Sequence, residues 1–297
     1  MTMKLVETTA KSIITPSKLP DADYVVNPYT GCSFACSYCY ASFMGRFVGE
    51  AIEAWGSYVY VKTNAVDLFR KEIARFPEEK RQSSILLSSV TDAWQGPEKK
   101  YRLARGILEC LVEERYPGPV SILTKSPLVL DDLELISYLP TPDVGVTVTS
   151  TDDAISRVFE AHAPLASDRL KILQEFNRAG VPTYAFVGPL FPHFRFRPEK
   201  LDELFARIAD TGTQDVYVEL LNLSKYIRKR LDTVMEETAP ELIASYASAD
   251  EKEHRRVLEN MVREMVEKHH LRMRLDNVID HREDANARDA SAGGIRE

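Results

Sequence analysis

The sequence has few cysteines, no long apolar run and no apolar segment at its start. It holds four cysteines in 297 residues, three of them crowded together, so a framework of disulfides is not expected. No apolar stretch approaches the ~20 residues that a membrane-spanning helix needs. The first residues lack the apolar core of a secretory signal. We therefore predict a cytoplasmic protein with reduced cysteines and no membrane partner.

An excess of basic residues is also missing. The formal net charge is −7, whereas non-specific binding to nucleic acid draws on clustered Lys and Arg that neutralise phosphates. This balance argues mildly against such binding and leaves room for a local basic groove. Two short basic runs stand out, Phe194–Arg197 and Tyr226–Arg230. We interpret each as a solvated surface face.

What is present is a group of three cysteines, Cys32, Cys36 and Cys39. Spacings of four and three residues let three thiolates converge from one tight loop and hold three corners of a cubane iron–sulfur cluster, because thiolate is the ligand that such iron demands. The fourth iron has no cysteine and stays open to an external ligand. A cluster of this kind can bind and reduce S-adenosylmethionine. Tyr38, directly before the last cysteine, fits an aromatic side chain that packs near the adenine.

Zinc is the main alternative for the three cysteines. Structural zinc usually takes four protein ligands, typically in paired C-x2-4-C units, and no fourth Cys or His lies at a matching spacing. Cysteines with no shared role are a further alternative.

The remaining cysteine and the histidines are interpreted mostly as structural. Cys110 lies among apolar residues at helical spacing and is expected to be a small buried hydrophobe. His254, His269 and His270 are expected to be solvated on a charged helix. His162 follows the predicted fourth strand and is kept as a functional candidate.

Short β-branched runs alternate with amphipathic helical stretches over most of the chain, which is the pattern of βαβ units and a parallel sheet. Six strands are predicted, over residues 57–62, 83–88, 120–124, 143–149, 182–187 and 214–220. Six βα units are too few to close an eight-stranded barrel, so we predict an α/β fold built as a partial (β/α)6 TIM-like barrel. Functional residues are then expected in the loops at the carboxyl ends of the strands.

The chain is predicted to divide near residue 222. Residues 1–222 form the partial barrel with an N-terminal cluster-binding segment, and residues 223–297 form a mainly helical C-terminal extension. The extension includes a helix over 249–269 and a strand over 271–275. Its last stretch, 284–297, has little to bury and is expected to be a mobile tail.

The cysteine run followed by six βα units resembles the radical S-adenosylmethionine (radical SAM) superfamily. Motifs between residues 24 and 222 further resemble its spore photoproduct lyase-like branch, whose members are often labelled DNA repair photolyases. The motifs are Asn27–Tyr40, Phe43–Phe47, Val90–Gln95, Ile122–Pro127 and Tyr184–Leu190. They are specific for the superfamily and branch but weak for the substrate, because branch members have diverse substrates.

The resemblance implies an enzyme of lyase or transferase type with a [4Fe–4S] cluster and S-adenosylmethionine as cofactors. It also implies an external one-electron donor of the flavodoxin or ferredoxin type. Reductive cleavage of the C5′–S bond would give a 5′-deoxyadenosyl radical, which abstracts a hydrogen from a small-molecule or nucleic-acid substrate that the sequence does not identify. The protein orients the reactive carbon and excludes competing hydrogen donors.

Similarity and chemistry together assign the cofactor-binding candidates, which lie beside the cysteines or at predicted strand ends. Thr91 and Asp92 can hold the methionine ammonium, and Lys125 can pair with its carboxylate as a point charge. Hydroxyls after the fourth strand suit the ribose, and a glycine after the fifth lets the backbone lie close to the adenine. The full set is Tyr38, Tyr40, Thr91, Asp92, Lys125, Thr147, Thr149, Ser150, Val187 and Gly188.

Each assignment has a structural alternative. Thr and Ser at strand ends often satisfy only local backbone groups. Lys125 can be a solvated loop charge, and Asp92 can cap a turn. In this superfamily the place of Thr91 and Asp92 often carries Gly-Gly-Glu, which leaves the role of Asp92 open.

One position departs from the branch. In spore photoproduct lyases a cysteine, two residues before the hydroxyl residue that follows the second strand, returns a hydrogen atom to the product radical. The matching residue is Ser89, whose O–H bond is far too strong for that role. A lesion lyase of this type is therefore an alternative to the leading hypothesis. The others are transfer of a 3-amino-3-carboxypropyl group and a non-catalytic iron–sulfur redox protein.

Overall fold

The computed structural model of the protein describes residues 3–280. Its main sheet has eight strands in the order β11-β10-β9-β8-β7-β6-β3-β2, and all neighbours except the antiparallel pair β2 and β3 run parallel. The strands are β2 (Ile14–Pro16), β3 (Tyr24–Val26), β6 (Ile85–Leu87), β7 (Val120–Thr124), β8 (Pro142–Thr147), β9 (Thr183–Leu190), β10 (Asp215–Leu220) and β11 (Arg272–Met273).

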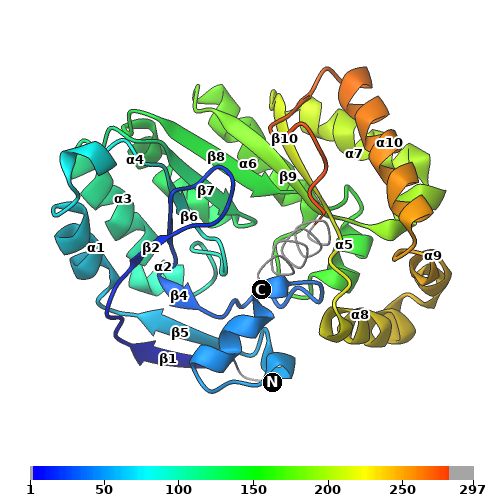
Figure 1. Ribbon diagram of the computed structural model, residues 1–297, viewed down its shortest axis with the longest axis horizontal. Helices are drawn as coiled ribbons and strands as arrows, with labels where there is room; N and C mark the ends of the chain where they lie inside the picture. Colours follow the sequence, from blue (N-terminus) through cyan, green and yellow to red (C-terminus); the bar gives the residue numbers. More distant parts are fainter. Residues whose placement is uncertain (1–2, 281–297) are drawn as a thin grey trace, which may run out of the picture.

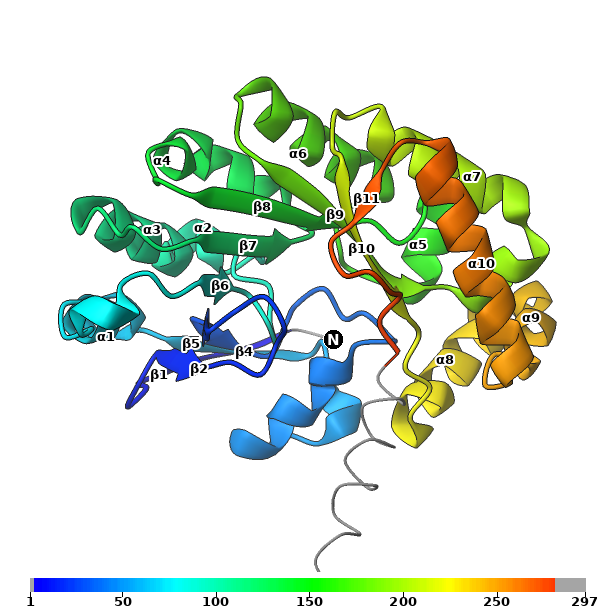
Figure 2. The ribbon, with the colours of Figure 1, turned by 45° about the horizontal axis from the view of Figure 1, so that its top comes forward.

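Helices cover the outer face of this curved sheet (Figures 1 and 2). They are α1 (Ala65–Ile73), α2 (Glu98–Tyr101), α3 (Leu103–Glu113), α4 (Leu133–Ser137), α5 (Asp153–Phe159), α6 (Ala166–Arg178) and α7 (Pro198–Ala209). The two edge strands, β2 and β11, do not pair with each other, so the sheet stays open. The predicted partial (β/α)6 barrel is confirmed.

The membership of the sheet differs from the prediction at its first strand. Residues predicted as strand 57–62 form β5 (Tyr58–Lys62), which pairs with β1 (Lys4–Thr8) and β4 (Tyr29–Thr30) in a separate three-stranded sheet. β3 takes the first place in the barrel instead. Three residues are too short to stand out as a β-branched run, whereas β5 has the alternation of a longer strand. The six strands of the barrel are therefore β3 and β6 to β10, and β2 and β11 extend the sheet at its two edges.

Helix α3 illustrates how the sequence builds the layer outside the sheet. Its apolar residues recur at helical spacing and are buried against the sheet. Its first backbone N–H groups are capped by the Glu98 carboxylate, which accepts hydrogen bonds from Leu103 (3.0 Å) and Ala104 (2.8 Å). Tyr29 also donates to Glu98, and burial raises the pKa of this carboxyl to about 7. The cap thus ties the segment before the cysteines to the helical layer.

Three further helices follow β10: α8 (Lys225–Thr238), α9 (Ile243–Ala247) and α10 (Lys252–Lys268). The last of them packs against α7 and the short helix η5 (Pro192–Phe196). The expectation that His254 is solvated is wrong. This histidine is fully buried, and its ring nitrogens lie 3.0 Å from Ser248 Oγ and 3.1 Å from the Pro192 carbonyl oxygen. The predicted mobile tail, 284–297, lies outside the described residues.

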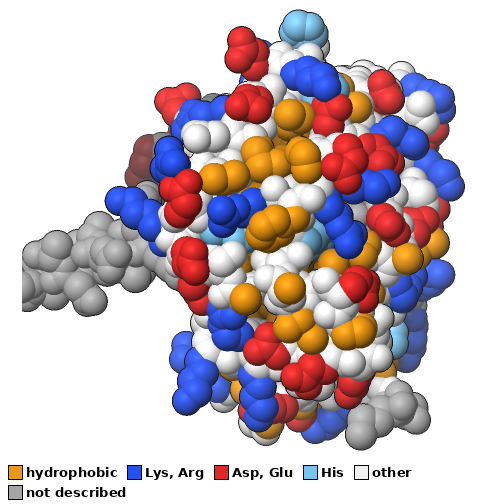
Figure 3. Space-filling view, turned by 90° about the vertical axis from the view of Figure 1, so that its right-hand side faces the viewer, with side chains coloured by type: hydrophobic (Ala, Val, Ile, Leu, Met, Phe, Trp, Pro, Cys, Tyr) orange, Lys and Arg blue, Asp and Glu red, His pale blue; other side chains and the backbone are white. Residues whose placement is uncertain are grey.

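The surface over these C-terminal elements carries charges of both signs. Figure 3 shows acidic and basic side chains interspersed on this face, with small groups of apolar side chains between them. Within residues 3–280, no helix combines the length and the apolar character that crossing a membrane requires.

Candidate functional site: the three-cysteine loop

The three cysteines lie on the loop that follows β4, beyond the carboxyl end of β3, the first strand of the barrel. All are free thiols; Cys32 and Cys36 are buried and Cys39 is half-buried. The loop begins at Gly31, which has φ +90°, and a Cβ there would lie 2.4 Å from the Tyr58 carbonyl oxygen. Only glycine fits this turn. Conformation and close packing therefore fix where the first cysteine leaves the sheet.

Side chains from the segment after β6 hold the loop. Gln95 accepts a hydrogen bond from the Ser33 backbone (2.8 Å) and donates to the Gly31 carbonyl oxygen (3.2 Å). The Thr91 hydroxyl also donates to Gly31 (2.6 Å) and accepts from Gln95 (2.9 Å). Thr91 was predicted to touch the cofactor; its hydroxyl is engaged with the cysteine loop itself.

A second set of contacts fixes Ser89, the residue in place of the branch cysteine. Asn27 accepts from the backbone of Ser89 (2.9 Å) and Val90 (3.1 Å), and its amide donates to the Ser89 hydroxyl (2.9 Å). The Tyr40 hydroxyl donates to the Ser89 carbonyl oxygen (2.5 Å). Tyr40 is partly exposed. It thus joins the cysteine loop to the segment after β6.

Asp92 joins the carboxyl ends of β6 and β7. Its carboxylate accepts hydrogen bonds from the Trp94 backbone (2.9 Å), the Thr124 hydroxyl (2.8 Å) and the Lys125 backbone (2.8 Å). Burial raises its pKa, and these hydrogen bonds oppose the rise. The turn-capping alternative for Asp92 is therefore realised, and the cap positions Lys125 beside the loop.

Tyr38 is oriented by a buried ionic network that the sequence did not suggest. Its hydroxyl donates to Glu160, which forms an ion pair with Arg169; both charged side chains are fully buried. The Thr149 hydroxyl donates to the same carboxylate (3.3 Å). Lys125 Nζ lies 5.8 Å from the centre of the Tyr38 ring, within cation–π range. Strand ends of the barrel and the cysteine loop therefore meet around this tyrosine.

The charges of this network balance one another. Burial by itself would raise the pKa of Glu160, but Arg169 and then Lys125 outweigh it and hold the pKa below its ordinary value. Arg169 also donates to the Pro164 carbonyl oxygen through Nε (2.9 Å) and Nη2 (2.7 Å). The carboxylate that accepts the Tyr38 hydrogen bond is thus ionised and fixed in place.

The cysteines themselves fit an iron–sulfur cluster. Burial raises the pKa of all three thiols, that of Cys36 to about 12, while Lys125 opposes the rise at Cys36 and Cys39. Binding of iron would supply the positive charge that deprotonates them. Among the described residues no three His, Cys, Asp or Glu side chains converge on one metal ion. A cubane makes a different demand, because each cysteine binds a separate iron.

The other predicted residues are more dispersed. The Ser150 hydroxyl accepts from the Asp152 backbone (3.0 Å), a local turn contact. Thr147 is buried at the end of β8, where its carbonyl oxygen accepts from Arg169 (3.5 Å). Val187 and Gly188 lie inside β9, which runs three residues further than the predicted strand. Cofactor contacts by these residues stay predictions.

Two residues outside the cofactor set were also assigned from the sequence. Cys110 is fully buried within α3, as expected for a packing residue. His162 is exposed, and its backbone N–H donates to the Phe34 carbonyl oxygen (3.1 Å).

Sequence reasoning missed four residues that shape the site: Gln95, Glu160, Arg169 and Arg230. Gln95 lies within a motif used for the resemblance, and Glu160 lies two residues before His162. A residue type alone gave no reason to select them. Arg230 belongs to a basic run that was interpreted as a solvated face, but it donates to the Cys39 carbonyl oxygen (3.0 Å).

Comparison with known proteins identifies the class to which this fold and loop belong. The sequence profile described as "Radical SAM superfamily" matches residues 26–205, and the chain belongs to this superfamily. Its members use a [4Fe–4S] cluster and S-adenosylmethionine, so the cofactors predicted from the cysteine loop are confirmed. They also need an external electron donor.

Two particular relatives are similar to the chain, and their names state no activity. The chain is 35% identical over 190 residues to uncharacterized protein MJ0683 of Methanocaldococcus jannaschii, covering 64% of this chain and 69% of that protein. It is 32% identical over 240 residues to uncharacterized protein Rv2578c of Mycobacterium tuberculosis (strain H37Rv), covering 77% and 69%.

Solved structures show the same fold. Spore photoproduct lyase complexed with dinucleoside spore photoproduct aligns with a TM-score of 0.69 at 19% identity, covering 91% of this chain and 82% of that one. A mutant of spore photoproduct lyase aligns with a TM-score of 0.70 at 18% identity, with the same coverage of both chains. The resemblance to the spore photoproduct lyase-like branch is confirmed at the level of the fold.

Proposed function

We propose that this protein reductively cleaves S-adenosylmethionine and uses the 5′-deoxyadenosyl radical to abstract a hydrogen from a substrate still to be determined. The cluster would supply the electron for this cleavage. Cys32, Cys36 and Cys39 would hold three of its irons, and the fourth would bind the methionine part of the cofactor. The observation that carries the proposal is the convergence of the three-cysteine loop, Tyr38 and Lys125 at one edge of the open barrel.

The residues around the loop have distinct parts in this proposal. Lys125 offers a positive charge to the methionine carboxylate, and its backbone is fixed by Asp92. Tyr38 offers an aromatic ring to the adenine, with its orientation set by Glu160. Buried aromatic neighbours, such as Phe191 at 5.8 Å between ring centres, keep water away from the ring.

An external one-electron donor of the flavodoxin or ferredoxin type belongs to the proposal, as does a reducing, cytoplasmic location. The free thiols support the reducing compartment.

A lesion lyase of the spore photoproduct type is the second candidate. The shared fold favours it, since the matching structure holds a dinucleoside spore photoproduct. Ser89 argues against the usual route, because its hydroxyl stands where the branch places a thiol and is hydrogen-bonded to Asn27. We therefore rank this candidate below hydrogen abstraction from another substrate.

Product analysis after anaerobic reconstitution tests the proposal. The full chain, reduced with dithionite and given S-adenosylmethionine, is expected to release 5′-deoxyadenosine and methionine. Release of 5′-methylthioadenosine would instead indicate transfer of the 3-amino-3-carboxypropyl group. An intact cluster with no turnover would favour a redox protein. Adding dinucleoside spore photoproduct tests the lyase candidate, which predicts its conversion to thymidine units.

A further inference from the structure

Helix α8 reaches the cysteine loop through one side chain. Arg230 Nη2 donates to the carbonyl oxygen of Cys39 (3.0 Å) and to the hydroxyl of Ser42 (3.2 Å). Ser42 is fully buried, so this contact lies inside the protein. Arg230 also lies outside residues 26–205, the part that matches the superfamily profile.

The guanidinium is held in a poorly solvated place. Its Nε and Nη1 are buried and have no hydrogen-bond partner among the described residues. Burial lowers the pKa of Arg230, but a guanidinium stays protonated in proteins. Its carbon lies 5.7 Å from the centre of the Tyr226 ring. Arg230 therefore carries a positive charge at a half-buried position, where water screens it less than at an exposed one.

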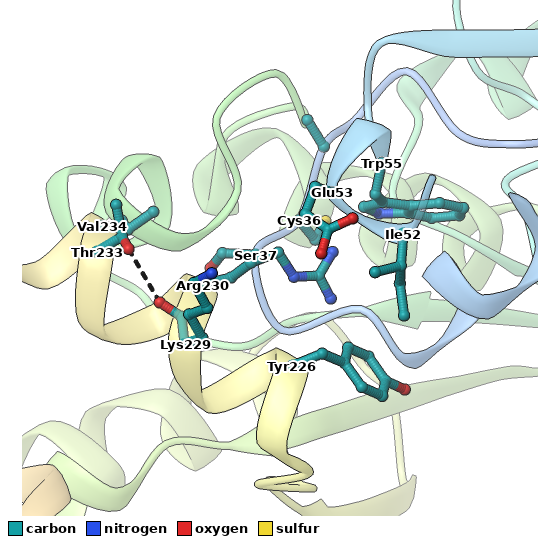
Figure 4. A pocket seen from close by; sticks show the side chains of 11 residues that line it. Cys36, Ser37, Ile52, Glu53, Trp55, Tyr226, Lys229, Arg230, Thr233 and Val234 are labelled. Carbon is teal, nitrogen blue, oxygen red and sulfur yellow. Dashed lines mark hydrogen bonds between the residues drawn. The ribbon is translucent and has the colours of Figure 1, made fainter. Parts of the chain in front are cut away.

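This charge borders the cysteine loop from helix α8, and like Lys125 it opposes the rise in the pKa of Cys39. A cavity of about 320 Å³ separates α8 from the loop, and Cys36 and Arg230 both line it. Figure 4 shows the Arg230 side chain extending from α8 toward Cys36, between Glu53 and Tyr226. Glu53 is exposed at this cavity, so its opposing charge is screened by solvent.

The potential of an iron–sulfur cluster depends on nearby charge, on hydrogen bonds and on solvent exposure. Reduction adds one negative charge, which a buried cation beside the ligands stabilises. A hydrogen bond to a ligand's backbone also fixes the loop in one geometry. Arg230 supplies both effects at Cys39.

We propose that Arg230 is a positioning residue for the cluster, which raises the reduction potential and fixes the backbone of Cys39 from helix α8. This inference rests on the proposed function, because it requires the cluster to bind at the three cysteines. It assigns the C-terminal helix a direct part in how readily the enzyme accepts its electron.

A redox titration of the reconstituted full chain, followed by electron paramagnetic resonance, tests this. Arg230→Gln removes the charge and is expected to lower the ratio of reduced to oxidised cluster about tenfold at the wild-type midpoint, a shift of ~59 mV to more negative potential for one electron. Arg230→Lys keeps the charge, and its midpoint potential is expected to lie close to the wild-type value. The signal reports only protein that holds a cluster, so partial loss of iron does not obscure the result.

Two variants on the same helix serve as matched controls, since each also removes one positive charge. Arg228 pairs with Asp250, and Lys229 is exposed; Arg228→Gln and Lys229→Gln are expected to leave the midpoint near the wild-type value. A midpoint in Arg230→Gln equal to that of these controls would overturn the inference. A shift in Arg230→Lys as large as in Arg230→Gln would overturn the role of charge. Wild-type protein without any cluster would refute the proposed function instead.

Discussion

The cysteine loop and helix α3 both bury cysteines, but they surround them differently. Cys110 sits on a regular helix beside the apolar Ile107 and Leu111, and is fully buried. Cys36 is 6% exposed, yet it lies on irregular backbone with Lys125 and Arg230 close to the loop. Burial alone therefore does not distinguish a metal ligand from a packing residue. The difference lies in the balance of nearby charge, since several carboxylates help to raise the pKa of Cys110 whereas Lys125 opposes the rise in that of Cys36, and in the hydrogen bonds that fix the loop backbone.

The largest expected effect is the difference between replacing Cys36 and replacing Cys110. Cys36→Ala is expected to abolish the brown colour of the cluster and the cleavage of S-adenosylmethionine, because a thiolate ligand is lost. Cys110→Ala is expected to keep both and to lower the free energy of unfolding by about 1 kcal/mol. Absorption spectra and product analysis measure the first pair of properties, and urea unfolding the second. Retention of the cluster in Cys36→Ala would refute its assignment as a ligand.

The buried ion pair behind Tyr38 gives the next largest effect. Arg169→Met leaves Glu160 charged and unpaired in the interior, and we expect a loss of about 3–5 kcal/mol in the free energy of unfolding. Anaerobic urea unfolding of reconstituted protein measures it. Arg178→Met, on the same helix, removes an exposed pair with Glu175 and should cost less than ~1 kcal/mol. Equal losses in the two variants would show that the network does not stabilise the site.

A pH dependence of stability is expected from His193, a buried polar residue away from the cysteine loop. Burial, and then Arg197, lowers the pKa of His193 from 6.5 to about 4. The unfolded chain then binds more protons between these values, so stability is full above pH ~6.5 and falls as the pH approaches ~4, by roughly 3 kcal/mol. His193→Gln cannot titrate and is expected to lose that much less than wild type over this range. If the free energy of unfolding depended on pH equally in wild type and His193→Gln, the prediction would be contradicted.

The smallest expected effect concerns a single side chain that holds the loop. Gln95→Met leaves the Ser33 backbone N–H without its acceptor and weakens the support of Gly31, at a cost of about 1–2 kcal/mol. Gln82 is exposed, and Gln82→Met should change stability by less than ~0.5 kcal/mol. Urea unfolding compares the two. A neutral Gln95→Met would mean that the loop keeps its shape without this contact.

Local patterns predicted most of the fold. Runs such as Val120–Thr124 are long and β-branched enough to be recognised as strands, and the alternation with helices predicts a parallel sheet. β3 was missed because Tyr24–Val26 is short. β5 was wrongly predicted as the first strand of the barrel because Tyr58–Lys62 has a stronger pattern. Which strand joins which sheet depends on pairing partners far along the chain.

For the site too, local patterns predicted some residues and long-range packing determines the others. The spacing of the cysteines predicts their shared role within one loop, and Lys125 was found because strand ends converge at one edge of the sheet. Glu160 lies 122 positions from Tyr38, and Arg230 lies 191 positions from Cys39. Such partners are set by tertiary packing, so no local pattern marks them. Ser150 was selected from its strand-end position, but its hydroxyl satisfies a local turn.

The most direct test of the central claim is metal and sulfide analysis of the anaerobically reconstituted chain, combined with its paramagnetic resonance spectrum before and after adding S-adenosylmethionine. A three-cysteine cluster with one open iron predicts iron and sulfide in a ratio near four to four per chain, and a spectrum that changes when the cofactor binds. Bound zinc without sulfide, or a cluster whose spectrum ignores the cofactor, would contradict the account.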